Sequence, residues 1–423
     1  MRRGPALRAG GVSAACLCLP AALAAPAFAA PATTAGPAAA RQAGAELAGL
    51  PGPVAGCPGT HGIAAPAATP WAQQALGFSA VWPLTQGTGV TVAVVDSGVD
   101  ANPQFGDRVT VGPDLAGVTF GTPAGADCVG HGTSVASIIG AAPLAGISFA
   151  GVAPQAGILS VKITNSDTFP GQVTAQAIRD AVNLGANVIN LSLATTVSTP
   201  ALQAAVQFAQ ARNVVVVAAA GNDSAGGATG PFYPAAYPGV LSVGAVGPDG
   251  SLASFSDTRT PVSVTAPGIG VTSAYPGTFP AAYNPGDNGT SFAAAFVSGI
   301  AALVRASYPD LDEAQVVARI TTTADGPAGP GTGHGMVNPV QAVTAVLPAA
   351  ALAGSTAAGA QGTGQDPAGR VRIIRAAPPD RTGRTVAFSV AAGAAGLAVL
   401  VTAAALAIPA GRRRHWHPGL PSA

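Results

Sequence analysis

Charge is scarce in this 423-residue chain. Asp, Glu, Lys and Arg together make up 9% of the residues, the formal net charge is +1, and Lys162 is the sole lysine. A protein that binds nucleic acid or another polyanion needs a charged field of one sign, and this composition offers none. We therefore expect no nucleic-acid partner. The few acidic residues also form no loop of the kind that binds calcium, so we expect no metal and no cofactor.

The first residues, 1–29, have the layout of a secretory signal peptide. Three arginines fall within the first eight residues, and a short apolar run follows at 12–23. Ala27-Phe28-Ala29 then supplies a small-x-small cleavage site. The alternative is a disordered, alanine-rich tail. The pattern favours export, with residues 1–29 removed from the mature chain.

Cysteine is scarcer still, with four in the chain. Cys16 and Cys18 lie in the predicted signal peptide, which leaves Cys57 and Cys128 in the mature protein. Two cysteines outside the cytoplasm most simply form one disulfide. It would close a loop of about 70 residues and stabilise the fold by roughly 4 kcal/mol on the chain-entropy model. The alternative is two free thiols.

A second targeting feature lies near the C-terminus. Residues 386–408 carry no charge and are long enough to cross a bilayer. Three arginines at 412–414 follow at once, as a stop-transfer cluster does. Arginines also precede the span, so the predicted orientation rests on the signal peptide, which places the N-terminal side outside. A buried core helix is the alternative, but the Pro- and Gly-rich flanks argue against it.

The same region also has a faint likeness to a cell-wall sorting signal. Arg381-Thr382-Gly383 precedes the apolar run and the arginines. However, Pro379-Asp380 stands where such a signal would have Leu-Pro, and the tail after the arginines is long. A membrane span at 386–408 with a short cytoplasmic basic tail at 409–423 remains our prediction.

Between the termini, apolar runs with the pattern of strands alternate with runs that have the spacing of helices. Residues 30–79 read as an N-terminal extension, 80–346 as one folded domain, and 347–385 as a Pro-, Gly- and Ala-rich linker. Within the domain we predict strands at 90–95, 157–163, 187–193, 214–219 and 240–246, and helices at 135–139, 173–184, 200–212 and 291–307. Strands that alternate with helices indicate an α/β fold with a parallel sheet covered on both faces.

Three polar residues stand where an apolar element ends or begins. Asp96 closes the strand at 90–95, His131 precedes an apolar helix, and Ser291 opens a long one. Singly, each is more often a cap or a turn residue. Together they match a chemistry: a serine hydroxyl needs a base, histidine supplies it, and a carboxylate fixes the histidine tautomer. Acyl transfer also needs a donor for the oxyanion, and Asn222 ends another strand.

These segments resemble the active-site signatures of the subtilisin family. The likeness rests on Asp96-Ser97-Gly98, His131-Gly132-Thr133 and Gly289-Thr290-Ser291, and it covers about residues 85 to 345. The resemblance implies a subtilisin-like fold and a serine endopeptidase. It also implies catalytic roles for Asp96, His131 and Ser291, an oxyanion hole that includes Asn222, and a substrate-binding strand at Ser192, Leu193 and Ala194.

A narrower resemblance is to the mycosins, the membrane-anchored subtilases of type VII secretion systems. It rests on Pro70-Trp71-Ala72-Gln73-Gln74, on residues 81–90, and on the order of the targeting segments. The resemblance implies that the extension at 30–79 wraps the catalytic domain and that the Cys57–Cys128 disulfide staples it near the cleft. It further implies a single-pass membrane protein with an extracytoplasmic catalytic domain, protein or peptide substrates, and a type VII membrane complex as partner.

Two residues depart from the subtilisin pattern. Ala295 stands where the family has proline, and we expect a loss below roughly 1 kcal/mol with a small effect on the alignment of Ser291. Ala194 stands where glycine is common, and its methyl group should narrow the subsites of the substrate strand. Both favour slow or selective cleavage. The competing hypothesis is a structural subunit of the secretion complex whose proteolysis is weak or dispensable.

Overall fold

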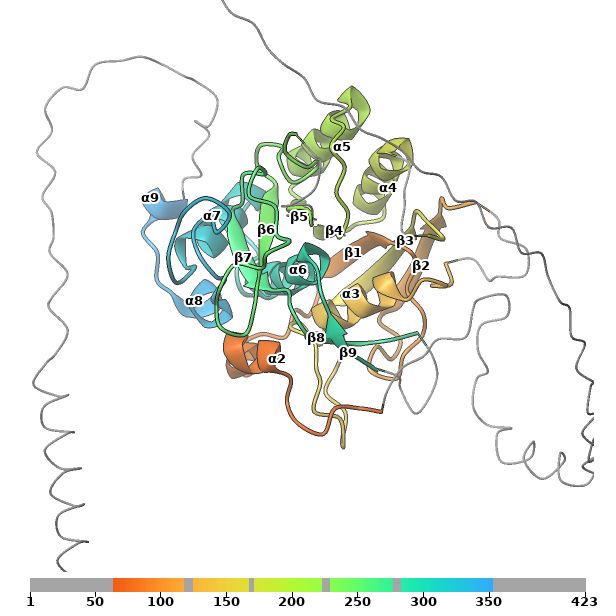
Figure 1. Ribbon diagram of the computed structural model, residues 1–423, viewed down its shortest axis with the longest axis vertical. Helices are drawn as coiled ribbons and strands as arrows, with labels where there is room; N and C mark the ends of the chain where they lie inside the picture. The colour runs from red at the N-terminus through yellow and green to blue at the C-terminus, as the bar shows by residue number, and fades with distance from the viewer. Residues whose placement is uncertain (1–63, 118–124, 167–170, 223–228, 277–282, 353–423) are drawn as a thin grey trace, which may run out of the picture. The chain divides into compact units, whose positions relative to one another are not determined.

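The computed structural model describes residues 64–117, 125–166, 171–222, 229–276 and 283–352 (Figure 1). The predicted signal peptide, linker, membrane span and basic tail lie outside the described residues, apart from the start of the linker. Cys57 lies outside them as well, so its pairing with Cys128 stays a prediction.

A seven-stranded sheet forms the centre of the fold, and every neighbouring pair in it is parallel. Its spatial order is β2-β3-β1-β4-β5-β6-β7. The strands are β1 (Thr91–Asp96), β2 (Val109–Asp114), β3 (Gly157–Lys162), β4 (Val188–Leu191), β5 (Val215–Ala219), β6 (Leu241–Val246) and β7 (Val264–Pro267). β1 lies between β3 and β4: on one side the chain reaches the edge strand β2 before it returns to β3, and on the other it runs outward from β4 to β7. The carboxyl ends of the strands, where the strand order switches, are where such sheets bind ligands.

Helices cover both faces of this sheet (Figure 1). On one side lie α4 (Gly171–Asn183) and α5 (Pro200–Ala211), and on the other lie α3 (His131–Gly140) and α6 (Thr290–Ser307). The alternation of β1 explains both cores: Val92 and Val94 join the cluster with α3 and α6, whereas Ala93 and Val95 join the cluster with α4 and α5. Successive side chains of a strand point to opposite faces. Asp96 lies two residues after Val94, so its side chain points to the same face of the sheet, toward α3.

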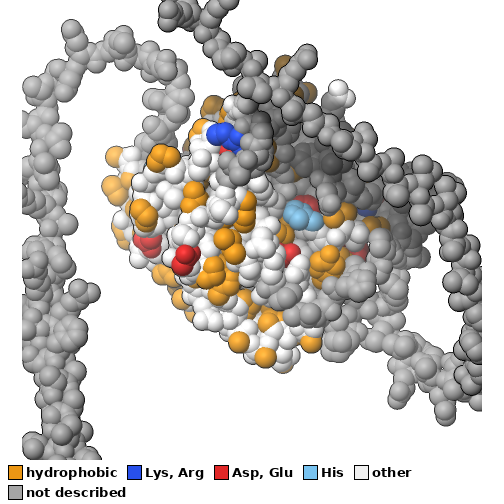
Figure 2. Space-filling view, viewed as in Figure 1, with side chains coloured by type: hydrophobic (Ala, Val, Ile, Leu, Met, Phe, Trp, Pro, Cys, Tyr) orange, Lys and Arg blue, Asp and Glu red, His pale blue; other side chains and the backbone are white. Residues whose placement is uncertain are grey.

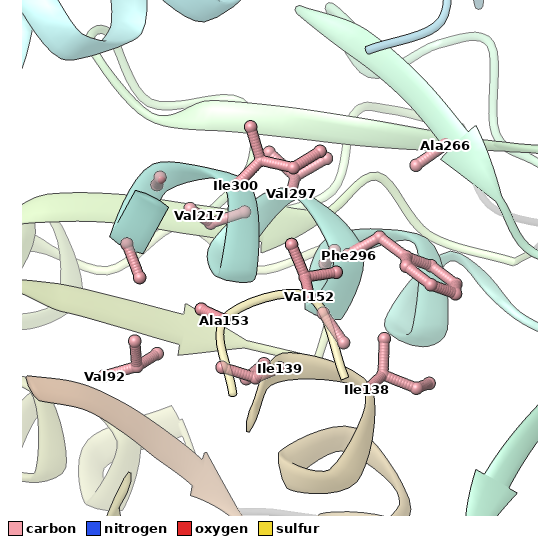
Figure 3. Packing of buried hydrophobic residues seen from close by; sticks show 14 of the residues in the cluster. Val92, Ile138, Ile139, Val152, Ala153, Val217, Ala266, Phe296, Val297 and Ile300 are labelled. Atoms are coloured by element: carbon pink, nitrogen blue, oxygen red, sulfur yellow. The ribbon is translucent and has the colours of Figure 1, made fainter. Parts of the chain in front are cut away.

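The core between α3 and α6 is close-packed (Figure 3). Ile138 and Ile139 of α3 meet Val297 and Ile300 of α6 with no exposed surface on any of the four. Burial of such a side chain contributes roughly 1.5–3 kcal/mol. The first residues of both helices are therefore held in fixed positions relative to the sheet.

Smaller elements surround the sheet. They are α2 (Trp71–Leu76), a 3₁₀ turn η1 (Phe78–Val81), the antiparallel pair β8 (Val271–Ala274) and β9 (Tyr283–Asp287), and the helices α7 (Glu313–Thr322), α8 (Pro339–Thr344) and α9 (Ala349–Leu352). In α2, the Trp71 indole donates hydrogen bonds to the carbonyls of Ile269 and Gly270, both at 3.0 Å. Ala150 N donates to Gln73 Oε1 at 3.1 Å. Ser148 Oγ donates to the carbonyl of Ala67 at 3.1 Å, so the described end of the extension is bonded to the domain at three places.

The α/β fold predicted from the sequence is confirmed, and each predicted strand and helix is present. The helix expected at 135–139 begins earlier, at His131, because Gly130 takes a positive φ of 90° and starts it there. Ala295 lies in the second turn of α6, fully buried inside a continuous helix.

Among the described residues, α6 is the one helix long and apolar enough to cross a membrane. It is a core helix instead, since 83% of its most apolar window is buried inside the domain. The predicted span at 386–408 is a different segment and lies outside the described residues.

Candidate active site

Asp96 and His131 meet at the carboxyl end of β1. His131 Nδ1 lies 2.8 Å from Asp96 Oδ1 and 3.0 Å from Oδ2. An ionised carboxylate can only accept, so Nδ1 carries the proton and Nε2 is left as the basic nitrogen. The Asp96 side chain is 6% exposed and that of His131 is 31% exposed, so the imidazole is reached from solvent while its partner is not.

Two glycines allow this close approach. A Cβ on Gly132 would lie 2.1 Å from the carbonyl oxygen of Gly98, which no side chain can tolerate. Gly98 itself has a φ of 113° and abuts the carbonyl of Gly125. The loop after β1 and the first turn of α3 are therefore in direct backbone contact, which explains the glycines in both signature motifs.

Asp127, which the sequence analysis did not single out, fixes the start of α3. It is fully buried, and its carboxylate accepts from Gly130 N at 2.8 Å and from Thr133 N and Oγ1, both at 2.7 Å. Ser97 Oγ donates to it at 2.8 Å and accepts from Gly132 N at 3.0 Å. These bonds satisfy first-turn N–H groups that a helix leaves open. An aspartate four residues before the histidine was the available signal.

Opposing influences set the pKa of His131. Desolvation by burial is the largest single influence and lowers it, but the charge and hydrogen bond of Asp96, with the charges of Asp127 and Asp287, outweigh burial and raise the pKa above its usual 6.5. Phe292 packs on the ring, with 5.4 Å between the centroids. The environment therefore favours the imidazolium form.

Ser291 stands in the first turn of α6, next to the end of β4. Its hydroxyl donates to the carbonyl of Ser192 at 3.2 Å, and Ser192 Oγ donates back to the carbonyl of Ser291 at 2.9 Å. Asn190 Nδ2 donates to Ser192 Oγ at 2.9 Å, and Ser298 Oγ donates to Asn190 Oδ1 at 2.8 Å. This buried chain fixes α6 against β4. The period-two alternation of β4 places Asn190 and Ser192 on one face, but it does not indicate that Ser298 reaches them.

Asn222 follows β5 and is held by Thr290. Its Oδ1 accepts from Thr290 N at 2.9 Å and from Thr290 Oγ1 at 2.7 Å. A backbone N–H can only donate, so the accepting atom must be the amide oxygen, which fixes the orientation of the side chain. Nδ2 is then the donor that the Asn222 side chain can offer to a ligand.

One cleft of about 400 Å³ joins these groups. Asp96, His131, Asn222 and Ser291 line it, together with the predicted substrate strand Ser192, Leu193 and Ala194. The structure thus brings together all the residues proposed from sequence for catalysis, the oxyanion hole and substrate binding. Figure 2 shows that the viewed face carries few charged side chains, in keeping with the low charge of the chain.

Known proteins resemble this chain in sequence and in fold. The family model described as "Subtilase family" matches residues 87–364. Mycosin-1 of Mycolicibacterium smegmatis is 35% identical over 66% of this chain and 73% of its own length. Mycosin-3 of Mycobacterium tuberculosis is 35% identical over 81% of this chain and 84% of its own length. A solved structure described as the MycP3 protease from the type VII (ESX-3) secretion system superposes with a TM-score of 0.58 at 34% identity, covering 69% of this chain and 92% of that one.

Proposed function

Because the chain belongs to the subtilase family of serine peptidases, we propose that Asp96, His131 and Ser291 are its catalytic triad and hydrolyse peptide bonds. The observation that carries the proposal is the Asp96–His131 bond of 2.8 Å, which leaves Nε2 basic in the same cleft as Ser291. The Ser291 hydroxyl, which donates to Ser192 at rest, turns to Nε2 and attacks the carbonyl carbon as its proton moves to His131. His131 then donates this proton to the amine nitrogen as the C–N bond breaks, and a water molecule that His131 deprotonates in turn hydrolyses the acyl-enzyme ester and frees Ser291.

The proposal is tested by covalent labelling. A fluorophosphonate probe reacts with a serine hydroxyl only where a base has activated it. We expect the purified protein to be labelled, and peptide mapping by mass spectrometry to locate the adduct on Ser291. A folded protein that stays unlabelled, or that carries the adduct on another serine, would contradict the triad assignment.

The oxyanion of the tetrahedral intermediate needs a donor, and we assign this role to Asn222 Nδ2 with the backbone N–H of Ser291. Asn222→Ala should lower kcat roughly 10²- to 10³-fold with little change in KM, a range measured in subtilisin itself. The reason is that this bond forms with the developing charge and not with the bound substrate. Steady-state kinetics on a peptide substrate checks it.

Thr290→Val is the matched variant for this test. It removes the Oγ1 bond to Asn222 but leaves the Thr290 N–H bond in place. We therefore expect a smaller loss of kcat than in Asn222→Ala. A rise in KM at constant kcat in Asn222→Ala would move the residue from the oxyanion hole to simple substrate binding.

The pKa of His131 sets the pH dependence. General-base catalysis needs the neutral imidazole, so activity should rise with pH through the pKa of His131. Because the surrounding carboxylates raise that pKa, half-maximal kcat/KM should lie above pH 6.5. Asp287→Asn removes one of these charges and should move the midpoint to lower pH.

Asp180→Asn is the control for the pH profile. Asp180 also accepts an amide hydrogen bond, from Gln176 at 2.8 Å, but it lies on α4, on the opposite face of the sheet. Its removal should leave the midpoint unchanged. Equal shifts in both variants, or a midpoint below 6.5 in the unmodified protein, would contradict the electrostatic argument.

For its place in the cell, we propose an extracytoplasmic domain anchored in the membrane by residues 386–408 and associated with a type VII secretion system. The signal-peptide pattern and the span support the topology, and the likeness to the mycosins supports the partner. Detergent extraction should recover the full chain with its C-terminal tail attached, and pull-down from those membranes should recover secretion components. A chain cleaved at residues 381–383 and bound to the cell wall would overturn the anchor.

A further inference from the structure

Phe232 lines the substrate cleft and lies against Gly221, the residue next to Asn222. Leu193, Ala194 and Ala219 line the same cleft. Phe232 is the largest side chain of these five residues and is 8% exposed. The other four are small or aliphatic, so this part of the lining is apolar and the aromatic ring is its bulkiest member.

The ring of Phe232 is held in place by its surroundings. A Cβ on Gly221 would lie 2.6 Å from Cδ2 of the ring, so the ring lies directly on the backbone of Gly221. The backbone N–H of Phe232 donates to Thr260 Oγ1 at 2.9 Å, and that hydroxyl donates to the carbonyl of Ala220 at 2.8 Å. The Arg259 guanidinium lies 5.8 Å from the ring centroid and is bonded to Asp257. The hydrogen bond fixes the backbone of Phe232, and rotation of the ring out of the cleft would break its contacts with Gly221 and Arg259.

The proposed chemistry fixes which substrate residue meets this ring. The scissile carbonyl must lie between Ser291 Oγ and Asn222 Nδ2. The leaving group must lie toward His131, because His131 gives it a proton. The side chain of the residue before the scissile bond is one carbon from the carbonyl, so it enters the end of the cleft beside Asn222, where Gly221 and Phe232 lie.

We infer that Phe232 restricts this protease to substrates with glycine, alanine or serine immediately before the scissile bond. The inference rests on the proposed function. An aromatic side chain needs a pocket that buries about 150–250 Å² of its surface, and the Phe232 ring, which lies against Gly221 in the cleft lining, leaves less room for one. Ala194, whose methyl group lines the same cleft, narrows it further.

Kinetics with peptides that differ only at this residue test the inference. The unmodified protein should cleave the alanine peptide with a kcat/KM at least about 100-fold above that for the phenylalanine peptide. Phe232→Ala should raise kcat/KM for the phenylalanine and leucine peptides by roughly 10- to 200-fold, the range over which a change in the size of an apolar pocket alters kcat/KM in enzymes. Its activity on the alanine peptide should change far less.

Phe208→Ala is the matched control. Phe208 lies on α5 and, like Phe232, has an arginine over its ring, with Arg212 at 4.9 Å. It is absent from the cleft lining, so its removal should leave the preference unchanged. Phe232→Leu, which keeps an apolar side chain against Gly221, serves if Phe232→Ala does not fold, and should give a smaller shift in the same direction.

The outcomes separate the two proposals. No cleavage and no fluorophosphonate labelling in the unmodified protein would overturn the proposed function. A labelled, active protein that cleaves the phenylalanine peptide as fast as the alanine peptide would overturn the role of Phe232 alone. So would a Phe232 variant that is labelled and active but keeps the original preference.

Discussion

Replacement of Ser291 by alanine should lower kcat by roughly 10⁶-fold, because the variant keeps the cleft but has no nucleophile. Loss of the corresponding serine in subtilisin has an effect of this size. The variant should still hydrolyse the peptide faster than the uncatalysed reaction in water, since Asn222 and the substrate strand remain. The measurement is single-turnover cleavage of a peptide with alanine before the scissile bond.

The fold of this variant should survive. The bond from Ser192 Oγ to the backbone carbonyl of Ser291 does not involve the lost hydroxyl, and α6 is otherwise buried. We expect a melting temperature close to that of the unmodified protein. Ser298→Ala is the informative companion: it also loses one hydroxyl of α6, the one bonded to Asn190, but it leaves the nucleophile in place. Equal losses of kcat in both variants would point to a structural cause.

The Ser291→Ala variant also distinguishes an enzymatic role of the protein from a structural role in the secretion system. If Ser291→Ala cells secrete normally while cells that lack the protein do not, the protein acts in the secretion system mainly as a structural subunit. If secretion fails in both, proteolysis itself is required. The comparison needs equal amounts of the two proteins in the membrane, which immunoblotting establishes.

The sequence predicts the sheet and the cleft-lining residues well for physical reasons. Apolar runs such as β5 and β6 are buried on both faces, so their composition alone identifies them as strands. β2 escaped prediction because it is an edge strand that is partly exposed, with a mixed sequence. β7 escaped because it has four residues and ends at Pro267.

Contacts made across the fold could not be predicted in the same way. Asp127 and Ser97 bond to each other although 30 residues separate them, and Asn190 bonds to Ser298 from 108 residues away. Each looks like an ordinary turn, strand or helix residue in the linear sequence. Phe232 shows the same limit: its effect depends on its contact with Gly221, and no local pattern near it indicates a pocket.

Replacement of Asp96 by asparagine should lower kcat by about 10⁴-fold near neutral pH, the size of the effect that the same change has in a trypsin-type triad. Asp96 Oδ1 accepts from the backbone N–H of Ser97 at 2.7 Å, and only an oxygen can fill that place. The amide NH₂ of asparagine must then occupy the position of Oδ2, which lies 3.0 Å from His131 Nδ1. A donor there competes with the Nδ1 contact to the retained oxygen at 2.8 Å and favours the tautomer with the imidazole proton on Nε2, as the same change does in a trypsin-type triad.

His131 in that tautomer cannot take the proton of Ser291, so the loss should appear in kcat. The variant also lacks the negative charge that raises the pKa of His131, so the midpoint of its residual activity should move to lower pH. Asp287→Asn should also move the midpoint to lower pH, but it should not change the tautomer of His131. The reason is that Asp287 makes no hydrogen bond to the imidazole among those of the described residues. A large loss of kcat in Asp287→Asn, or an unshifted pH profile in Asp96→Asn, would show that the charge and the tautomer are not the separate contributions inferred from this geometry.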